Sequence, residues 1–240
     1  MSDDHEHSPE AIADRLAEGP TVSYLRDWVY GGIDGAVTTF AVVSGVVGAA
    51  LEPRIILLLG AANLLGDGFS MAAGNYVGTR TEQAEHEHYA AMERRHIDES
   101  PEGEREEVRQ IYRLKGIEGQ PLEDVVDAIT RERESWIATM LVEEFGLSPS
   151  RRSPMRAARA TFIAFLLTGT VPLLPWLAGM DDPFLLSSLL TAGVFFAIGS
   201  LKGRWSVQPS WASGLETMVI GGVASALAYG IGRGLAGLGL

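Results

Sequence analysis

The sequence of 240 residues contains no cysteine and has many fewer basic than acidic side chains. The absence of cysteine excludes disulfide scaffolds, thiolate metal sites and cysteine nucleophiles. Its 19 Lys and Arg against 31 Asp and Glu give a formal net charge of −12 at pH 7. This balance argues against nucleic acid as a partner, because phosphate binding needs a basic surface. No Walker sequence is present, so a nucleotide partner and ATP-driven transport are unsupported.

Charge is also nearly absent from two long parts of the chain. Residues 28–78 hold four charged side chains and residues 160–240 hold six, whereas residues 79–159 hold 31. A soluble domain mixes polar and apolar residues at helix or strand period, and this chain separates them into blocks. The distribution is typical of a membrane protein that carries a polar insert.

Five apolar stretches are long enough to cross ~30 Å of hydrocarbon as helices. They comprise residues 29–51, 55–78, 160–180, 184–201 and 212–236. We therefore predict an all-α membrane protein with five transmembrane helices. No secretory signal is visible near the amino terminus, and most Lys and Arg flank the spans on one side. The positive-inside rule then predicts a cytoplasmic amino terminus and insert, with the carboxyl terminus outside.

The predicted organisation has four parts. They are a cytoplasmic segment with a short amphipathic helix (1–27), spans one and two (28–78), a cytoplasmic helical metal-binding domain (79–155), and spans three to five (156–240). The second span has no stop signal before residue 98, so it should continue as one long helix. Pro101 and Pro121 predict the starts of two further helices, and Thr130 is expected to cap a third.

Three carboxylates lie at membrane depth, Asp34, Asp67 and Glu216. Each costs roughly 2.5–3.5 kcal/mol at the centre of a bilayer, so a compensating role is expected. A carboxylate in a Gly-rich stretch can hold a cation or a proton, which is what a proton-coupled carrier needs. The alternative is a helix-end or paired carboxylate, which is favoured for Glu216. Met71 follows Asp67 by one helical turn, and its thioether suits later first-row metals if it is more than a packing residue.

The insert is rich in potential metal ligands at helical spacing. Two Glu-x-x-His pairs occur, at Glu85 and Glu93, and this is the spacing that di-iron bundles use. A charged, solvated helix surface is the competing interpretation. The candidate metal ligands in the insert are Glu82, Glu85, His86, Glu93, His96, Glu104, Glu107, Met140 and Glu144.

Small residues recur every four positions in the second and fifth spans, which lets helix backbones approach closely in lipid. The pattern fits equally well with packing inside one subunit and with a dimer interface. In the second span the stripe comprises Ala62, Gly66, Ser70, Gly74 and Gly78.

These features together resemble a prokaryotic member of the vacuolar iron transporter family. The resemblance extends from Trp28 to Leu235, with an acidic helical insert between spans two and three. It rests on DGAVTTFAVVSGVVGA (34–49), GDGFSMAAGNYVG (66–78), RESWIATMLVEEFGL (133–147), PLLPW (172–176), SLKGRW (200–205) and SGLETMVIGGVASALAYGIG (213–232).

The resemblance implies a homodimer that exports Fe²⁺, and often Mn²⁺, from the cytosol in exchange for protons, with no organic cofactor. It implies a path at the dimer interface that includes Asp34 and Met71. It also implies metal capture in the insert by Glu93, Glu104, Glu107, Met140 and Glu144. Zn²⁺ and Co²⁺ are alternative ions, and the inner membrane of a cell is the expected location.

Three positions depart from the family pattern. His96 stands where Glu is usual, Leu141 where a second Met is common, and Asn75 where Glu is often seen. Two alternative functions stay open at this point. One is a membrane-anchored di-iron oxidase acting on Fe²⁺, and the other is a metal sensor or scaffold that does not transport.

Overall fold

The computed structural model describes residues 6–19, 21–148, 152–203 and 208–238, and every regular element in these ranges is a helix. The all-α fold class is therefore confirmed. The chain divides into two compact units. The first, here called the bundle, contains Met1–Tyr76 and Arg152–Leu240, and the second, here called the insert, contains Val77–Arg151.

Five helical segments among the described residues are long and apolar enough to cross a membrane, as predicted. They are α2 (Leu25–Gly48), α3 (Pro53–Glu99), Pro154–Leu177, α9 (Pro183–Gly203) and α10 (Ser210–Gly237). A short helix before them, α1 (Pro9–Glu18), begins where the Ser8 hydroxyl accepts a hydrogen bond from the Ala11 N–H at 3.3 Å. This is an ordinary N-cap.

The third span is not one uninterrupted α-helix. Its first part, α7 (Pro154–Thr170), is followed by a 3₁₀ turn, η1 (Val171–Leu173), and a four-residue helix, α8 (Leu174–Leu177). Pro172 and Pro175 account for the change, because proline has no N–H to donate and its ring clashes with the preceding turn.

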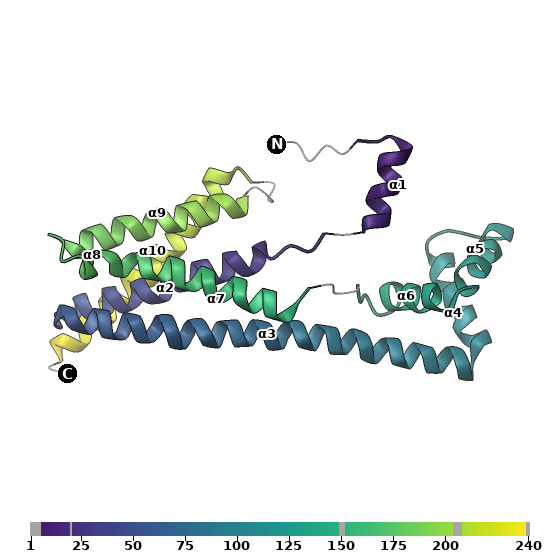
Figure 1. Cartoon of the computed structure of the whole chain (residues 1–240), viewed down its shortest axis with the longest axis horizontal. Coiled ribbons are helices and arrows are strands. Elements are labelled where there is room, and N and C mark those ends of the chain that lie inside the picture. The colour runs from purple at the N-terminus through teal and green to yellow at the C-terminus, as the bar shows by residue number, and fades with distance from the viewer. Residues whose placement is uncertain (1–5, 20, 149–151, 204–207, 239–240) are drawn as a thin grey trace. The chain divides into compact units, whose positions relative to one another are not determined.

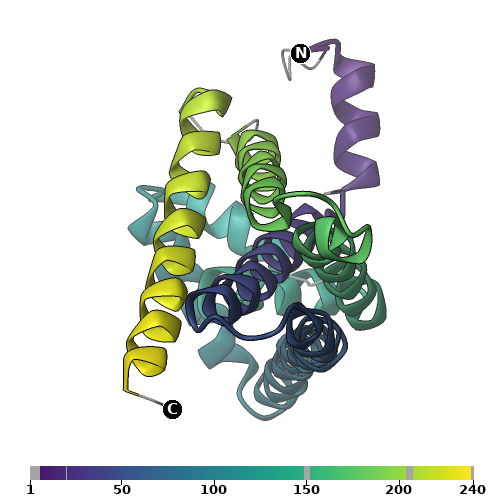
Figure 2. The same ribbon diagram turned by 90° about the vertical axis from the view of Figure 1, so that its left-hand side faces the viewer.

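Helix α2 lies at the centre of the bundle, in contact with α7, α9 and α10 (Figure 2). Glycine permits this packing: a Cβ atom on Gly35 would lie 2.4 Å from the carbonyl oxygen of Phe165 in α7. A Cβ atom on Gly232 of α10 would lie 2.1 Å from the carbonyl oxygen of Gly45 in α2. These contacts are backbone to backbone, so no side-chain movement can relieve a larger residue.

Helix α3 continues well beyond the length that a bilayer requires (Figure 1). Its 47 residues correspond to about 70 Å at 1.5 Å per residue. The prediction that the second span extends as one helix toward residue 98 is thus confirmed. Pro53 starts the helix and Ser100-Pro101 follows its last residue, and proline disfavours helix for the residue before it.

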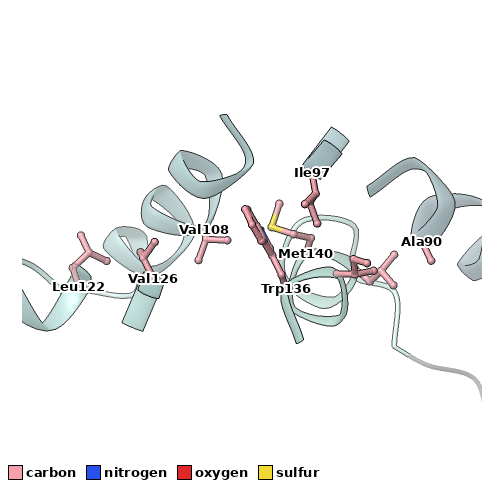
Figure 3. Packing of buried hydrophobic residues seen from close by; sticks show 9 residues of the cluster. Ala90, Ile97, Val108, Leu122, Val126, Trp136 and Met140 are labelled. Atoms are coloured by element: carbon pink, nitrogen blue, oxygen red, sulfur yellow. The ribbon is translucent and has the colours of Figure 1, made fainter. Parts of the chain in front are cut away.

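The insert contains the second part of α3 and three short helices, α4 (Pro101–Leu114), α5 (Gln120–Thr130) and α6 (Arg133–Glu143). They enclose an apolar core, part of which Figure 3 shows. This core consists of Ala90, Ile97, Val108, Leu122, Val126, Trp136, Ile137, Met140 and Leu141. The expectation that Thr130 caps α6 is wrong. Its hydroxyl donates to the Val126 carbonyl at 2.9 Å, the usual backbone bond of a helical threonine, and α6 begins after Glu132.

Substitution of Gly35 by alanine tests the packing of α2 on α7. The added methyl group would meet the backbone of Phe165, so we expect the bundle to lose about 1–3 kcal/mol of stability. Thermal unfolding of the detergent-solubilised chain measures the change. Gly193→Ala in α9 is the matched control, because nothing lies within 4 Å of its Cβ position, and it should leave the unfolding temperature unchanged. Equal behaviour of the two variants would contradict the packing described here.

Candidate functional site

Two of the three carboxylates predicted at membrane depth come together in the bundle. Asp34 on α2 and Asp67 on α3 are both partly buried and close enough for their charges to interact. Met71 lies one turn from Asp67 on the same face of α3 and packs beside the apolar cluster that contains Phe40 and Phe165. The arrangement places two acidic groups and a thioether between α2 and α3.

No Lys or Arg forms an ion pair with Asp34 or Asp67 among the residues that the structure describes. Two carboxylates that lie close together without a basic partner cannot both stay ionised at low cost. A proton or a cation at this position would lower that cost. The arrangement differs from a structural ion pair, in which a fixed basic side chain supplies the charge.

A polar contact that was not predicted from the sequence lies next to Asp34 and Asp67. Asn63 on α3 donates hydrogen bonds to the hydroxyls of Thr38 and Thr39 on α2, at 3.0 and 3.1 Å. Thr38 also donates to the backbone carbonyl of Asp34 at 2.9 Å. Asn63 precedes Asp67 by four residues and Thr38 follows Asp34 by four. This helical spacing could have predicted that the polar side chains lie on the same faces as the two carboxylates.

Glu216, the third carboxylate, is in a different environment. It is exposed on α10, and its carboxylate lies 3.6 Å from the ammonium group of Lys202 at the end of α9. This contact matches the alternative of a paired carboxylate near a helix end. No described contact brings Glu216 to Asp34, and its role in a transport path stays a prediction.

A second acidic cluster lies in the insert, where α3 and α4 meet. Glu93 on α3 and Glu104 on α4 are almost fully buried and hydrogen-bonded to each other. The Nδ1 atom of His96 lies 3.4 Å from Glu104 and 4.0 Å from Glu93. One carboxylate oxygen of each glutamate is buried without a hydrogen-bond partner. A buried acceptor without a donor is costly, and a bound cation would satisfy it.

Further candidate ligands surround this pair. Glu107 on α4 and Glu144, just after α6, both lie near enough to Glu93 to repel its charge. Met140 is fully buried in the apolar core with Ala90 and Ile97, which flank Glu93 on one face of α3 (Figure 3). The structure thus gathers the acidic candidates of three helices on one side of the insert core.

The remaining candidates do not join this cluster. Glu82 and Glu85 are exposed and His86 is half-buried on the earlier turns of α3. The two Glu-x-x-His pairs therefore stand in different environments, one on the surface and one partly buried. In the described ranges, no group of three or more His, Asp or Glu side chains is arranged so that it could hold one metal ion.

Burial, and then mutual repulsion, explain the electrostatics of the insert cluster. Burial, followed by the charge of Glu104, raises the pKa of the Glu93 carboxyl to about 8. Burial and the neighbouring acidic groups also raise the pKa values of Glu107 and Glu144. A proton shared between Glu93 and Glu104 is consistent with their hydrogen bond. The cluster can exchange this proton for a cation, since ligands must be deprotonated to bind a metal.

Residues 25–233 match the VIT family. The chain belongs to this family. The vacuolar iron transporter of Toxoplasma gondii is 32% identical over 221 residues, which cover 87% of this chain and 73% of that protein. Vacuolar iron transporter 1 of Arabidopsis thaliana is 32% identical over 213 residues, which cover 85% of this chain and 83% of the relative. Vacuolar iron transporter 1 of Oryza sativa is 28% identical over 235 residues, which cover 97% and 91% respectively.

Membership in the VIT family favours a transporter over the di-iron oxidase that the sequence left open. All three relatives are named as transporters and none as an oxidase. The chain accordingly belongs to a family whose named relatives are transporters. The geometry agrees, because Glu85 and His88 lie exposed on α3, whereas a di-iron site needs such pairs on facing helices.

The raised pKa of Glu93 predicts how pH affects the metal-free insert. Between the ordinary glutamate value of 4.5 and about 8, the folded chain retains a proton that the unfolded chain releases. The free energy of unfolding should therefore fall as pH rises through this window, and level off above it. Hydrogen exchange of amides in α4 and α6, measured in the whole chain, should be faster at pH 8.5 than at pH 6 after correction for intrinsic rates.

Glu93→Gln should remove most of this pH dependence, because its neutral amide keeps the size of the side chain. Glu102→Gln is the matched control, since Glu102 is an exposed carboxylate on α4. Adding Mn²⁺ at pH 8.5 should slow exchange in the unsubstituted chain. A pH dependence that survives in Glu93→Gln would contradict the assignment of the buried proton.

Proposed function

We propose that this protein exports divalent transition-metal ions, Fe²⁺ and also Mn²⁺, from the cytosol in exchange for protons. The observation that carries the proposal is the Asp34–Asp67 pair, two carboxylates between apolar helices with no described basic partner. The names of the relatives, vacuolar iron transporters, supply the class of ion. The notion of a sensor or scaffold that does not transport leaves this pair unexplained.

Capture begins at the insert in this proposal. The partnerless buried oxygens of Glu93 and Glu104 are hard ligands, and His96 adds a nitrogen. Met140, buried in the adjoining apolar core, is the candidate sulfur ligand. Glu107 and Glu144 increase the negative potential that attracts a divalent ion. An arriving ion displaces the proton held by Glu93, and the ordering of ligands from α3, α4 and α6 follows binding.

Release takes place through the bundle. Asp34 and Asp67 accept the ion as they lose protons, and protons entering from the opposite side displace the ion again. A carboxylate that alternates between proton and metal couples the two flows, because the two occupants compete for the same oxygens. Met71 contributes a polarizable sulfur beside this pair.

The donor set narrows the range of ions. Carboxylate and thioether ligands together suit Fe²⁺ and its neighbours better than Mg²⁺ or Ca²⁺, which prefer oxygen alone. Mn²⁺ accepts the oxygen-rich part of the set. Zn²⁺ and Co²⁺ are competing ions with weaker support, because the imidazole and thioether donors do not discriminate against them.

The proposed assembly is a homodimer in the inner membrane, with the amino terminus and insert cytoplasmic and the carboxyl terminus outside. The exposed small-residue stripe of α3 supports the dimer: nothing lies within 4 Å of the Cβ positions of Gly66, Gly74 and Gly78. Asp67 and Met71 lie on the same helix, so a second α3 would enclose the ion path. Residues 204 and 205 of the SLKGRW motif lie outside the described residues.

Replacement of Asp34 tests the exchange mechanism. In proteoliposomes with an imposed pH gradient, Asp34→Asn should lower Fe²⁺ and Mn²⁺ flux by more than about tenfold, because an amide cannot release a proton to a metal. Glu52→Gln, which alters an exposed carboxylate in the turn between α2 and α3, is the matched control and should retain normal flux. Normal flux through Asp34→Asn would remove this residue from the path.

Cysteine cross-linking tests the dimer, and the natural absence of cysteine makes the experiment direct. Gly74→Cys should form an intermolecular disulfide under mild oxidation in membranes, because the small-residue stripe would place two copies of α3 in contact. Gly193→Cys on α9 is the control and should remain monomeric on a non-reducing gel. The opposite pattern would place the interface on another helix.

A further inference from the structure

The bundle contains a buried ion pair that the transport path does not use. Asp27, in the first turn of α2, is only 2% exposed. Both of its carboxylate oxygens accept hydrogen bonds from one guanidinium nitrogen of Arg152, at 2.6 and 2.7 Å. The side chains come from positions 125 residues apart in the sequence. Removal of either partner from such a buried pair strongly destabilises the folded protein, because the other charge stays buried without compensation.

Asn75 on α3 completes the arrangement. Its amide nitrogen lies 2.8 Å from the Asp27 carboxylate and 2.7 Å from the hydroxyl of Thr161 on α7. One carboxylate thus binds α3 and the start of α7 to α2 through charged and neutral hydrogen bonds. A further hydrogen bond joins the same parts of the chain: the Tyr24 hydroxyl accepts from the Ser153 N–H at 2.9 Å.

The positions of the two Asp27 partners along the chain are informative. The insert comprises Val77–Arg151, so Asn75 lies two residues before it and Arg152 directly after it. These are the two points at which the chain leaves and re-enters the bundle. Both are fixed to the same carboxylate on α2, and Asp27 lies two helical turns from Asp34 on one face of that helix.

From this arrangement we infer that Asp27, with Arg152 and Asn75, transmits metal occupancy of the insert to the ion path. The inference rests on the proposed function. Ordering of the insert by a captured ion would pull on both chain crossings, and Asp27 would pass this displacement to α2 and hence to Asp34. Asp27 is a positioning residue in this scheme, because Arg152 already neutralises its charge and it does not need to touch the ion.

A double-substitution cycle on the full chain in proteoliposomes tests the coupling. In the otherwise unsubstituted protein, Glu93→Gln with Glu104→Gln should raise the Mn²⁺ concentration for half-maximal flux about tenfold. In an Asp27→Asn background the maximal flux should be lower, and the same insert substitutions should change the half-maximal concentration by less than about twofold. The exchange Asp27→Arg with Arg152→Asp should restore part of the flux and of the sensitivity to the insert, because it rebuilds the ion pair but not the hydrogen bond from Asn75.

Asn75→Ala is the second background, because it removes two hydrogen bonds while Arg152 still pairs with Asp27. It decides the question if Asp27→Asn fails to fold. Arg156→Gln, an exposed arginine on α7, is the matched control and should leave the cycle as in the unsubstituted chain. Thermal unfolding temperatures are measured for every variant, since a purely structural role would lower them without altering the response to insert substitutions.

The outcomes separate the two proposals. Additive effects of the bundle and insert substitutions, with normal flux in the unsubstituted protein, would overturn the coupling and leave the transport function standing. An unsubstituted protein without proton-driven metal flux would overturn the transport function and the coupling with it. Non-additive effects together with rescue by the exchanged pair would support both.

Discussion

The bundle depends on how carboxylates are neutralised among apolar helices. Water is scarce inside a lipid bilayer, and an ionised carboxylate without a partner there costs several kcal/mol. The chain solves this problem in two ways. Asp27 is paired permanently with Arg152, whereas Asp34 and Asp67 have no described basic partner and repel each other. A fixed ion pair holds helices together, and an unsatisfied pair of acids creates a demand for a mobile cation or proton.

The insert also has to neutralise buried carboxylates. Glu93 and Glu104 are buried beside a small apolar core, and the basic side chain that lies nearest to them among the described contacts is His96, at 3.4 Å from Glu104. Neighbouring arginines are directed elsewhere, as Arg109 shows by its hydrogen bonds to Glu123 at 2.7 and 2.9 Å. Pairing on the surface therefore leaves Glu93 and Glu104 without an arginine partner in the described part of the chain.

Local sequence patterns were sufficient for much of this architecture. Long apolar runs predicted five spans, and the missing stop signal predicted the length of α3. The break in the third span was missed although Pro172 and Pro175 marked it. The Asp27–Arg152 pair could not be predicted, because nothing local links positions 125 residues apart. Glu85 and Glu93 share one motif, but only packing against α4 determines which of them is buried.

Asn75 shows how one departure from the family pattern fits this electrostatic scheme. A glutamate at this position would place a second carboxylate beside Asp27, and Arg152 would then face two acids. Asparagine donates to Asp27 and to Thr161 with the same amide nitrogen, so its contacts are made without adding charge. In this chain Arg152 pairs with the Asp27 carboxylate, whereas Asp34 and Asp67 have no basic partner among the described residues. That difference is the reason why the proposed competition between protons and metal ions is assigned to Asp34 and Asp67 and not to the Asp27 site.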